Sequence, residues 1–261
     1  MNQRGTSVLL VLLGIFVFAG ASRAQDEKLN YAGFKGGISI PQLSGSDTNE
    51  LSRDYKSRLA PNFGGFVEFG VARRTSVQLE VNFAGQGGKR NGIQPVTQPI
   101  PGLPTLPAGS YYYANYRNTA KLNYLEFPAL VKYRFGKPEK TRIFVNGGAF
   151  YGHLLNAKTI TAGSSTLYLD RNGQVPVLLP PAGTPLPPIP FDAKTDIKND
   201  INSNNFGLTG GGGLEIPHRK NYFLIDVRVS YGLRAIQKDT VTNGNSKTGN
   251  LVISVGYGFN F

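Results

Sequence analysis

Apolar and polar residues alternate one by one over long stretches of the chain. This two-residue period runs through 76–86, 224–233 and 251–261. In the first of these stretches, Val77 and Leu79 are followed in turn by polar residues. Such a period predicts β-strands with two chemically different faces. No stretch shows the apolar stripe of an amphipathic helix, so the chain is predicted to be all-β.

Extending the pattern predicts eight strands, each long enough for the ~9–11 residues of a tilted transmembrane strand: 31–40, 61–71, 76–86, 121–135, 141–155, 205–216, 221–234 and 250–261. Their connections alternate between short and long. The short ones are Ala72–Thr75, Gly136–Lys140 and Pro217–Lys220, and the long loops are about 41–60, 87–120, 156–204 and 235–249. This layout predicts an eight-stranded antiparallel up-and-down transmembrane β-barrel with short periplasmic turns and long extracellular loops. The alternative, a soluble sandwich or lipocalin-like barrel, would not need all long loops on one side.

The first 24 residues are typical of a secretory signal peptide. Arg4 precedes a short apolar core at 8–19, and small residues follow at Ser22 and Ala24. Cleavage near Ala24 would leave 25–261 as the barrel domain. The alternative, a membrane anchor, has an apolar core short of the ~20 residues that span a bilayer.

Composition narrows the function further. Removal of Arg4 and Arg23 leaves 28 − 2 = 26 Lys+Arg against 16 Asp+Glu, a balance of +10. Export argues against nucleic acid as the partner and leaves an anionic membrane surface. The chain has no cysteine, which excludes disulfides and thiolate metal sites. Proline-rich runs at 95–107 and 176–190 favour extended structure, either as stiff surface loops or as a docking surface.

The alternation places charged residues on the lumen face of the barrel. Five are basic and five acidic, so they are predicted to form a paired interior network: Lys35, Glu68, Glu80, Glu126, Lys132, Arg134, Arg142, Glu215, Asp226 and Arg228. An eight-stranded barrel is just wide enough for side chains to fill it, which predicts a plugged lumen. Lumen glycines would leave room for Phe66, Tyr124 and Phe150.

Pro128 is the irregular residue of the stretch NYLEFPALVKYRFG at 123–136. Proline cannot donate to a strand ladder, and a closed barrel has no free edge. The sequence therefore predicts a bulge or one missing ladder bond at Pro128.

Aromatic residues near the strand ends predict interfacial girdles. On the periplasmic side they are Phe69, Phe135, Phe223, Phe259 and Phe261. On the outer side Tyr111–Tyr113 and Tyr116 lie at or above the rim, as a girdle or as a sugar- or lipid-stacking cluster.

No catalytic, cofactor or metal site is predicted. His218 lies in a periplasmic turn, and His153 faces lipid with no Ser, Asp or Glu pattern beside it. Asp192, Asp196 and Asp200 alternate with lysines and are interpreted as a solvated loop face rather than a calcium site.

Five segments resemble one known family: FKGGISIPQLSG (34–45), YLEFPALVKYRF (124–135), GGAFYGHLLNAK (147–158), DVRVSYGL (226–233) and ISVGYGFNF (253–261). In this order they resemble the PorT-like outer-membrane β-barrel proteins. The resemblance implies an eight-stranded barrel in a Gram-negative outer membrane and supplies no catalytic residues. The family takes its name from a member linked to secretion and gliding. The alternating Tyr257, Phe259 and Phe261 resemble the C-terminal signal read by the outer-membrane assembly machinery.

Three functional hypotheses follow from these observations. The first is a structural or surface-interaction protein with a filled, salt-bridged lumen. The second is a narrow passive channel or a secretion-associated barrel, and the third is a rim lipid-modifying enzyme. The expected partners are outer-membrane lipid and the assembly machinery, with an extracellular or secretion partner left open. The protein is expected to be a monomer without cofactors.

Overall fold

A computed structural model describes residues 30–45, 49–107, 109–181 and 183–261. The expected signal peptide at 1–24 lies outside the described residues. Eight long strands form the body of the protein: β1 (Tyr31–Ser44), β2 (Ala60–Ala72), β3 (Thr75–Val96), β4 (Tyr112–Phe135), β5 (Arg142–Ala162), β12 (Asn204–His218), β13 (Asn221–Gly232) and β14 (Lys247–Asn260).

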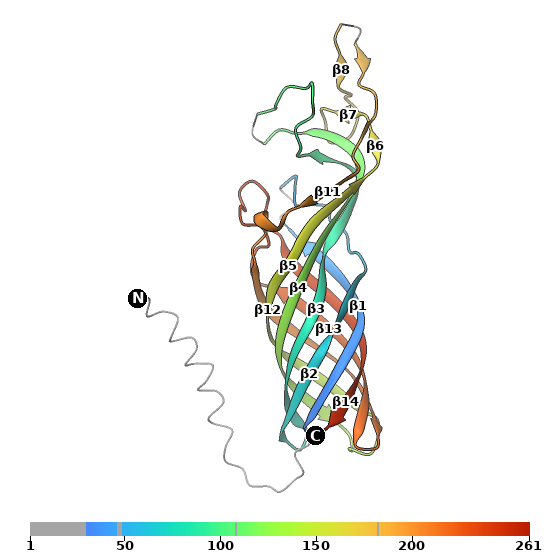
Figure 1. Ribbon diagram of the computed structural model, residues 1–261, viewed down its shortest axis with the longest axis vertical. Coiled ribbons are helices and arrows are strands. Elements are labelled where there is room, and N and C mark those ends of the chain that lie inside the picture. Colours follow the sequence, from blue (N-terminus) through green and yellow to red (C-terminus); the bar gives the residue numbers. More distant parts are fainter. Residues whose placement is uncertain (1–29, 46–48, 108, 182) are drawn as a thin grey trace, which may run out of the picture.

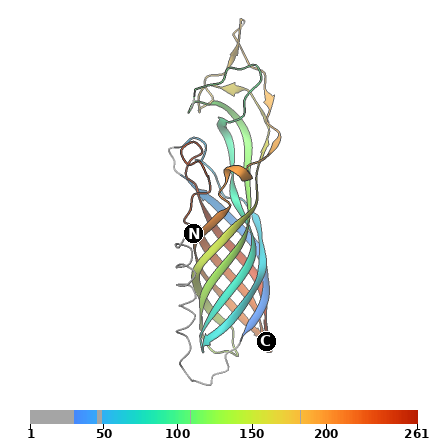
Figure 2. The same ribbon diagram turned by 60° about the vertical axis from the view of Figure 1, so that its left-hand side comes forward.

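The eight strands close into a barrel (Figures 1 and 2). Each strand pairs antiparallel with the next, in the order β1-β2-β3-β4-β5-β12-β13-β14. The last strand returns to the first, with Tyr31 opposite Asn260 and Ser44 opposite Lys247. Closure leaves no strand edge facing lipid, as a membrane requires. The predicted eight-stranded antiparallel barrel is confirmed.

Three strands extend far above the barrel, which corrects the predicted loops at 87–120 and 156–204. β3 continues to Val96, β4 already begins at Tyr112, and β5 continues to Ala162. The β3–β4 ladder is unbroken from Lys89 opposite Thr119 to Val96 opposite Tyr112. Figure 2 shows this twisted sheet rising above the barrel. The prediction ended the strands too early because it followed apolar lipid-facing residues, whereas backbone pairing above the membrane needs none.

The proline-rich segments pack onto this outer sheet. The second of them, with the residues around it, contains β6 (Ser164–Ser165), β7 (Leu167–Tyr168), β8 (Leu178–Leu179), β9 (Thr184–Pro185), β10 (Ile189–Pro190), β11 (Ala193–Asp196) and the 3₁₀ turn η1 (Lys198–Asp200). β7 pairs with β4, and β11 pairs with β5. The loops predicted at 41–60 and 235–249 are likewise shorter, because β1 runs to Ser44 and β14 begins at Lys247.

Pro128 interrupts the ladder between β3 and β4. Leu79 pairs with Ala129 and Asn82 with Glu126, while no pairs join the residues between them. Both missing pairs depend on a hydrogen bond from the N–H of position 128 to the carbonyl of Glu80, which proline cannot make. The register is unchanged across the gap, so the irregularity is a missing bond and not a bulge.

The outward face of the barrel is apolar. Large side chains exposed on it include Phe34, Phe63, Phe127, Val131, Ile143 and Val255. The five predicted periplasmic girdle residues are all exposed, between 43% for Phe69 and 65% for Phe261. In water so many exposed apolar side chains would be unfavourable, whereas lipid solvates them. Among the described residues, no helix has the length and apolar character needed to cross a membrane.

Candidate functional site

The lumen near the periplasmic end holds a dense cluster of ion pairs. Lys132 Nζ lies 2.5 Å from Glu215 Oε1 and 3.1 Å from Glu68 Oε2. Arg134 bonds to both carboxylates, at 2.7 Å from its Nε to Glu215. Arg142 Nη2 reaches Glu215 at 2.8 Å. Because both carboxylates are buried, each needs these cations to offset its lost hydration.

A second ion-pair cluster fills the middle of the lumen. Lys35 Nζ lies 2.8 Å from Glu80 and 3.4 Å from Asp226. Arg228 bonds to the same two carboxylates, at 2.9 Å to Glu80 and 2.6 Å to Asp226. The structure thus places nine of the ten predicted lumen residues in two ion-pair clusters. The tenth, Glu126, is buried and accepts a 3.0 Å hydrogen bond from Gln86, with no ion pair in the described chain.

Aromatic residues pack around the lower cluster. They form an apolar group of Tyr31, Phe66, Phe144, Tyr222 and Leu224. Lys132 Nζ lies 4.5 Å from the centre of the Phe144 ring, a cation–π contact. A Cβ added at Gly33 would lie 2.5 Å from Phe66 Cζ, so this glycine makes room for the ring.

An apolar layer closes the lumen above Glu126. It consists of Leu43, Leu122, Tyr124, Leu154, Ala157, Ile201 and Ile236. Ile201 and Ile236 lie outside the eight barrel strands, so the loops contribute to this closure. The cavity beside the middle ion pairs has only about 20 Å³, about the room that one water needs. Two charged layers and one apolar layer therefore close the barrel, and a further cavity of about 440 Å³ lies at its periplasmic mouth, beside Arg142, Glu215 and Tyr222.

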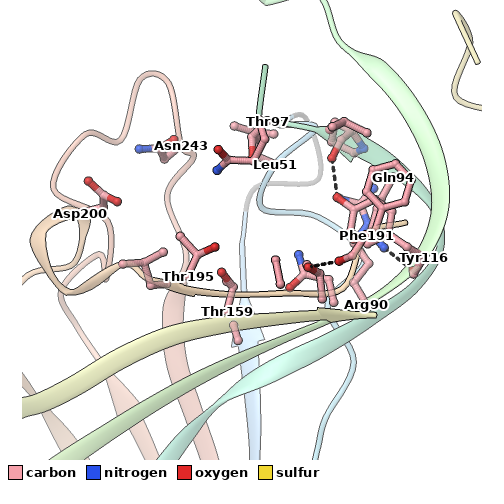
Figure 3. Close-up of a pocket in the computed structure, with 18 of the residues that line it drawn as sticks. Leu51, Arg90, Gln94, Thr97, Tyr116, Thr159, Phe191, Thr195, Asp200 and Asn243 are labelled. Carbon is pink, nitrogen blue, oxygen red and sulfur yellow. Dashed lines mark hydrogen bonds between the residues drawn. The ribbon is translucent and has the colours of Figure 1, made fainter. Parts of the chain in front are cut away.

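A much larger cavity of about 600 Å³ lies above the apolar layer (Figure 3). It is bounded by the outer parts of β3, β4 and β5 and by the long loops. Most of its polar lining is uncharged, from Gln94, Gln98, Asn118, Thr159, Thr161, Thr195, Gln237 and Asn243, and the charged residues are Arg90, Asp192 and Asp200. Such a lining suits a neutral ligand that exchanges hydrogen bonds with amides and hydroxyls.

Tyr116 and Phe191 form one wall of the outer cavity. Their rings stack with centroids 4.7 Å apart and an interplanar angle of 10°. The Tyr116 hydroxyl donates to the Pro95 carbonyl at 2.9 Å, and Gln94 Nε2 donates to the Tyr116 carbonyl at 2.6 Å. Burial raises the pKa of Tyr116 to about 12. Tyr116 is therefore a buried anchor for the proline-rich loop at 163–192, and the interpretation as an aromatic girdle is wrong for this residue.

Arg90 and Asn118 are two polar residues of the cavity wall that make hydrogen bonds to neighbouring loops. Arg90 Nη1 donates to the Glu50 carbonyl at 2.8 Å, and burial lowers the pKa of the guanidinium. Asn118 Nδ2 donates to the Tyr55 hydroxyl at 3.3 Å. The Asn118 Oδ1 atom is buried without a hydrogen-bond partner in the described part of the chain. It is a ready acceptor for a ligand donor.

Sequence reasoning missed this cavity. Its polar wall residues lie in the stretches predicted as loops, although Arg90 and Gln94 alternate with outward residues as strand residues do. This two-residue period is the signal that indicates a strand here. It is faint because both faces of the sheet are polar.

The two histidines, Asp192 and Asp196 contact amide or hydroxyl groups. His153 Nδ1 lies 3.3 Å from Asn204 Oδ1, and His218 Nδ1 lies 2.9 Å from the Tyr257 hydroxyl. Asp192 accepts a bond from the Gly163 amide, and Asp196 accepts one from the Lys198 amide. Within the described ranges, no three His, Asp or Glu side chains gather as a metal site would require.

The family model described as "Outer membrane protein beta-barrel domain" matches residues 23–238. The chain belongs to this family. It is therefore an integral protein of the outer membrane, and its lumen is filled by side chains and salt bridges. No curated protein matches the chain significantly.

Similar solved structures are small outer-membrane barrels. Ail, the attachment invasion locus protein of Yersinia pestis, shares 14% identity at a TM-score of 0.36, covering 88% of this chain and 99% of its own. The N-terminal β-barrel domain of Pseudomonas aeruginosa OprF shares 11% at 0.35, covering 90% and 100%. Neisserial surface protein A shares 8% at 0.38, covering 88% and 97%.

Proposed function

We propose that this protein acts at the cell surface, through its extracellular β-structure, and not by passing solutes through the barrel. The proposal rests on the difference between the filled lumen and the open space above it along the barrel axis. Two ion-pair clusters and an apolar layer fill the lumen, while a cavity of about 600 Å³ lies above them. Room for a ligand therefore exists on the outer side of the closure.

The continuous pairing of the outer strands supports a binding role. Strands β3, β4 and β5 continue into it without a break, and the proline-rich loop is held by Tyr116 and Phe191. A preformed cavity loses little conformational entropy when a ligand binds. The unpaired Asn118 oxygen and the largely neutral lining favour an uncharged ligand or partner loop that offers hydrogen-bond donors.

Conductance measurements test the closed barrel. The purified full chain in planar bilayers is expected to give no reproducible current steps at moderate voltage. A positive control opens all three layers: Leu122→Gly and Leu154→Gly truncate the apolar layer, and alanine replaces both partners of the pairs Arg228–Glu80 and Arg134–Glu215 in the two charged layers. Stable unitary steps from the unaltered protein would overturn the proposal and favour the passive channel.

The finer assignments are part of the same proposal. Removal of the first 24 residues, a single barrel domain at 25–261, a monomeric state and a PorT-like affiliation rest on sequence features. The proposal also includes no enzymatic role, which His153 supports because its polar partner is the side-chain oxygen of Asn204 and not a carboxylate. A secretion role is tested by comparing the exported proteins of a deletion strain with those of its parent. Loss of specific exported proteins would favour the secretion-associated alternative.

A further inference from the structure

The three short turns at the periplasmic end carry an excess of positive charge. Each contributes two basic residues, which together form what we call the basic ring: Arg73, Arg74, Lys137, Lys140, Arg219 and Lys220. All six side chains are exposed. The only acidic side chain in these turns is Glu139.

The basic ring is unpaired, in contrast to the lumen. Across the described ranges, none of its six side chains forms an ion pair or hydrogen bond, whereas the lumen cations are engaged by buried carboxylates. A charge that stabilises nothing within the fold does not need to be there for folding. The ring is thus available to a partner of opposite charge.

The turn at Arg219 places a basic residue in an unfavourable backbone conformation. Arg219 and Lys220 connect His218 and Asn221, which pair across the two-residue turn. Arg219 has φ = +59°, a conformation unfavourable for a side chain of this kind. A two-residue hairpin with positive φ at its first turn position favours glycine. The turn at Gly136 does use glycine, at φ = +101°.

The position of the basic ring relative to the membrane interface indicates its partner. Exposed phenylalanines of the girdle lie a few residues before or after each turn: Phe69 before Arg73, Phe135 before Lys137 and Phe223 after Lys220. Girdle aromatics lie at the membrane interface, so residues just beyond them lie at the level of the lipid phosphates. We propose that the basic ring binds the phosphate groups of anionic phospholipids in the periplasmic leaflet.

Spin-labelled lipids test this inference in the intact protein. The full chain is reconstituted in phosphatidylcholine vesicles containing spin-labelled phosphatidylglycerol or spin-labelled phosphatidylcholine, and the immobilised lipid fraction is measured. The expected preference for phosphatidylglycerol is about fivefold at low salt, the factor that about 1 kcal/mol gives. It should fall in 0.5 M salt, because screening then acts within a few ångströms.

Variants show which residues cause the preference for phosphatidylglycerol. Replacing all six ring residues by glutamine should abolish it. A matched pair, Arg73→Gln/Arg74→Gln against Lys89→Gln/Arg117→Gln, compares the ring with two exposed basic residues on the outer sheet. The first pair should weaken the preference and the second leave it unchanged. Equal loss in both pairs, or full retention without the ring, would overturn the proposal.

The strained turn supplies a second readout that misfolding cannot mimic. Arg219→Gly/Lys220→Gln should raise resistance to urea unfolding, because glycine relieves the positive φ, and yet weaken the lipid preference. If the variants leave the lipid preference intact but lose binding to isolated murein sacculi, the ring faces the cell wall and the lipid proposal is wrong. The lipid preference does not depend on conductance. Its absence would therefore overturn the lipid proposal and leave the proposed surface function unaffected.

Discussion

Arg228 and Glu80 form an ion pair across the whole barrel. Arg228 lies on β13 and Glu80 on β3, and these strands are opposite one another in the ring β13-β14-β1-β2-β3. The Arg228 Nη1 and Glu80 Oε2 atoms are nevertheless 2.9 Å apart. The lumen is therefore so narrow that two side chains bridge its diameter, and the charge network cross-links opposite walls.

Removal of one partner from this bridge should destabilise the barrel. Glu80→Gln leaves Lys35 and Arg228 buried with one carboxylate, Asp226, and is expected to lower the free energy of unfolding by about 3–5 kcal/mol. The measurement is urea unfolding in lipid vesicles followed by far-UV circular dichroism, since the chain has no tryptophan.

Glu126→Gln is the matched control for Glu80→Gln. Both glutamates are buried, but Glu126 has a hydrogen bond from Gln86 and no ion pair among the described residues. The change should cost less than about 1 kcal/mol, since an amide oxygen can accept the same bond. Equal losses for the two variants would show that the ion pairs are not what stabilises the interior.

Lumen glycines should differ from lipid-side glycines in their tolerance of a methyl group. A Cβ at Gly213 would overlap the Ile225 carbonyl and lie 2.9 Å from Phe144 Cζ, whereas the nearest atom to a Cβ at Gly147 is 3.9 Å away. Gly213→Ala is expected to lower the free energy of unfolding by about 1–3 kcal/mol, and Gly147→Ala to change it little. Heat-dependent gel mobility and urea midpoints measure both, and a neutral Gly213→Ala would contradict the packing described for Phe144.

Loss of the Tyr116–Phe191 stack should release the proline-rich loop. Phe191→Ala removes the ring that covers Tyr116 and is expected to increase protease cleavage within 164–192 severalfold on proteoliposomes. The barrel strands should remain protected, because the stack lies above them. Leu169→Ala, at a side chain 54% exposed, serves as the control and should leave cleavage unchanged. Faster cleavage in neither variant would show that the stack does not hold the loop.

Alkaline pH should release the same loop. Burial and the nearby Tyr55 raise the pKa of Tyr116 to about 12, while Arg90 acts in the opposite direction. A raised pKa means that the folded loop favours the neutral phenol. This stabilisation is fully present below about pH 10, the ordinary tyrosine value, and is lost as the pH rises toward 12.

A spin label at position 178 can follow this transition. Leu178→Cys introduces a unique cysteine, because the chain has none, at a side chain 51% exposed. Label mobility should increase between about pH 10 and 12. Tyr116→Phe should remove the pH dependence, and its persistence in that variant would assign the transition to another group.

The proposed C-terminal assembly signal predicts a defect in membrane insertion. Phe261→Ala is expected to lower the fraction of chain that reaches the folded, heat-modifiable form in cells. The control Ile253→Ala alters another lipid-facing residue of β14, 40% exposed, outside the signal. Equal assembly of both variants and the unaltered chain would contradict the signal.

The sequence specified the barrel well, for physical reasons. Lipid outside and a packed interior require strict alternation, so the eight strands and the lumen position of residues such as Lys132 and Glu215 could be predicted. Pro128 could be predicted as an irregularity because its missing N–H is a local property. The pairs that these charges form could not be predicted, since Arg228 and Glu80 are far apart in sequence and meet only because barrel closure puts their strands opposite one another.

The outer structure was harder to predict. Where no lipid is present, outward side chains need not be apolar, and the period that reveals strands becomes faint. Arg90 and Gln94 therefore looked like loop residues. Phe191 lies beyond a proline-rich run, and nothing local shows that it packs on Tyr116. The cavity depends on these long-range contacts, which no short pattern encodes.

The continuation of β3 beyond the barrel sets how far the protein extends above the membrane. Residues 87–96 add ten positions at ~3.3 Å each, roughly 30 Å of strand above the apolar belt. The two-residue strands β8 and β9 then form a small hairpin at the far tip (Figure 1). An antibody, phage or neighbouring cell can thus touch this hairpin without approaching the lipid surface.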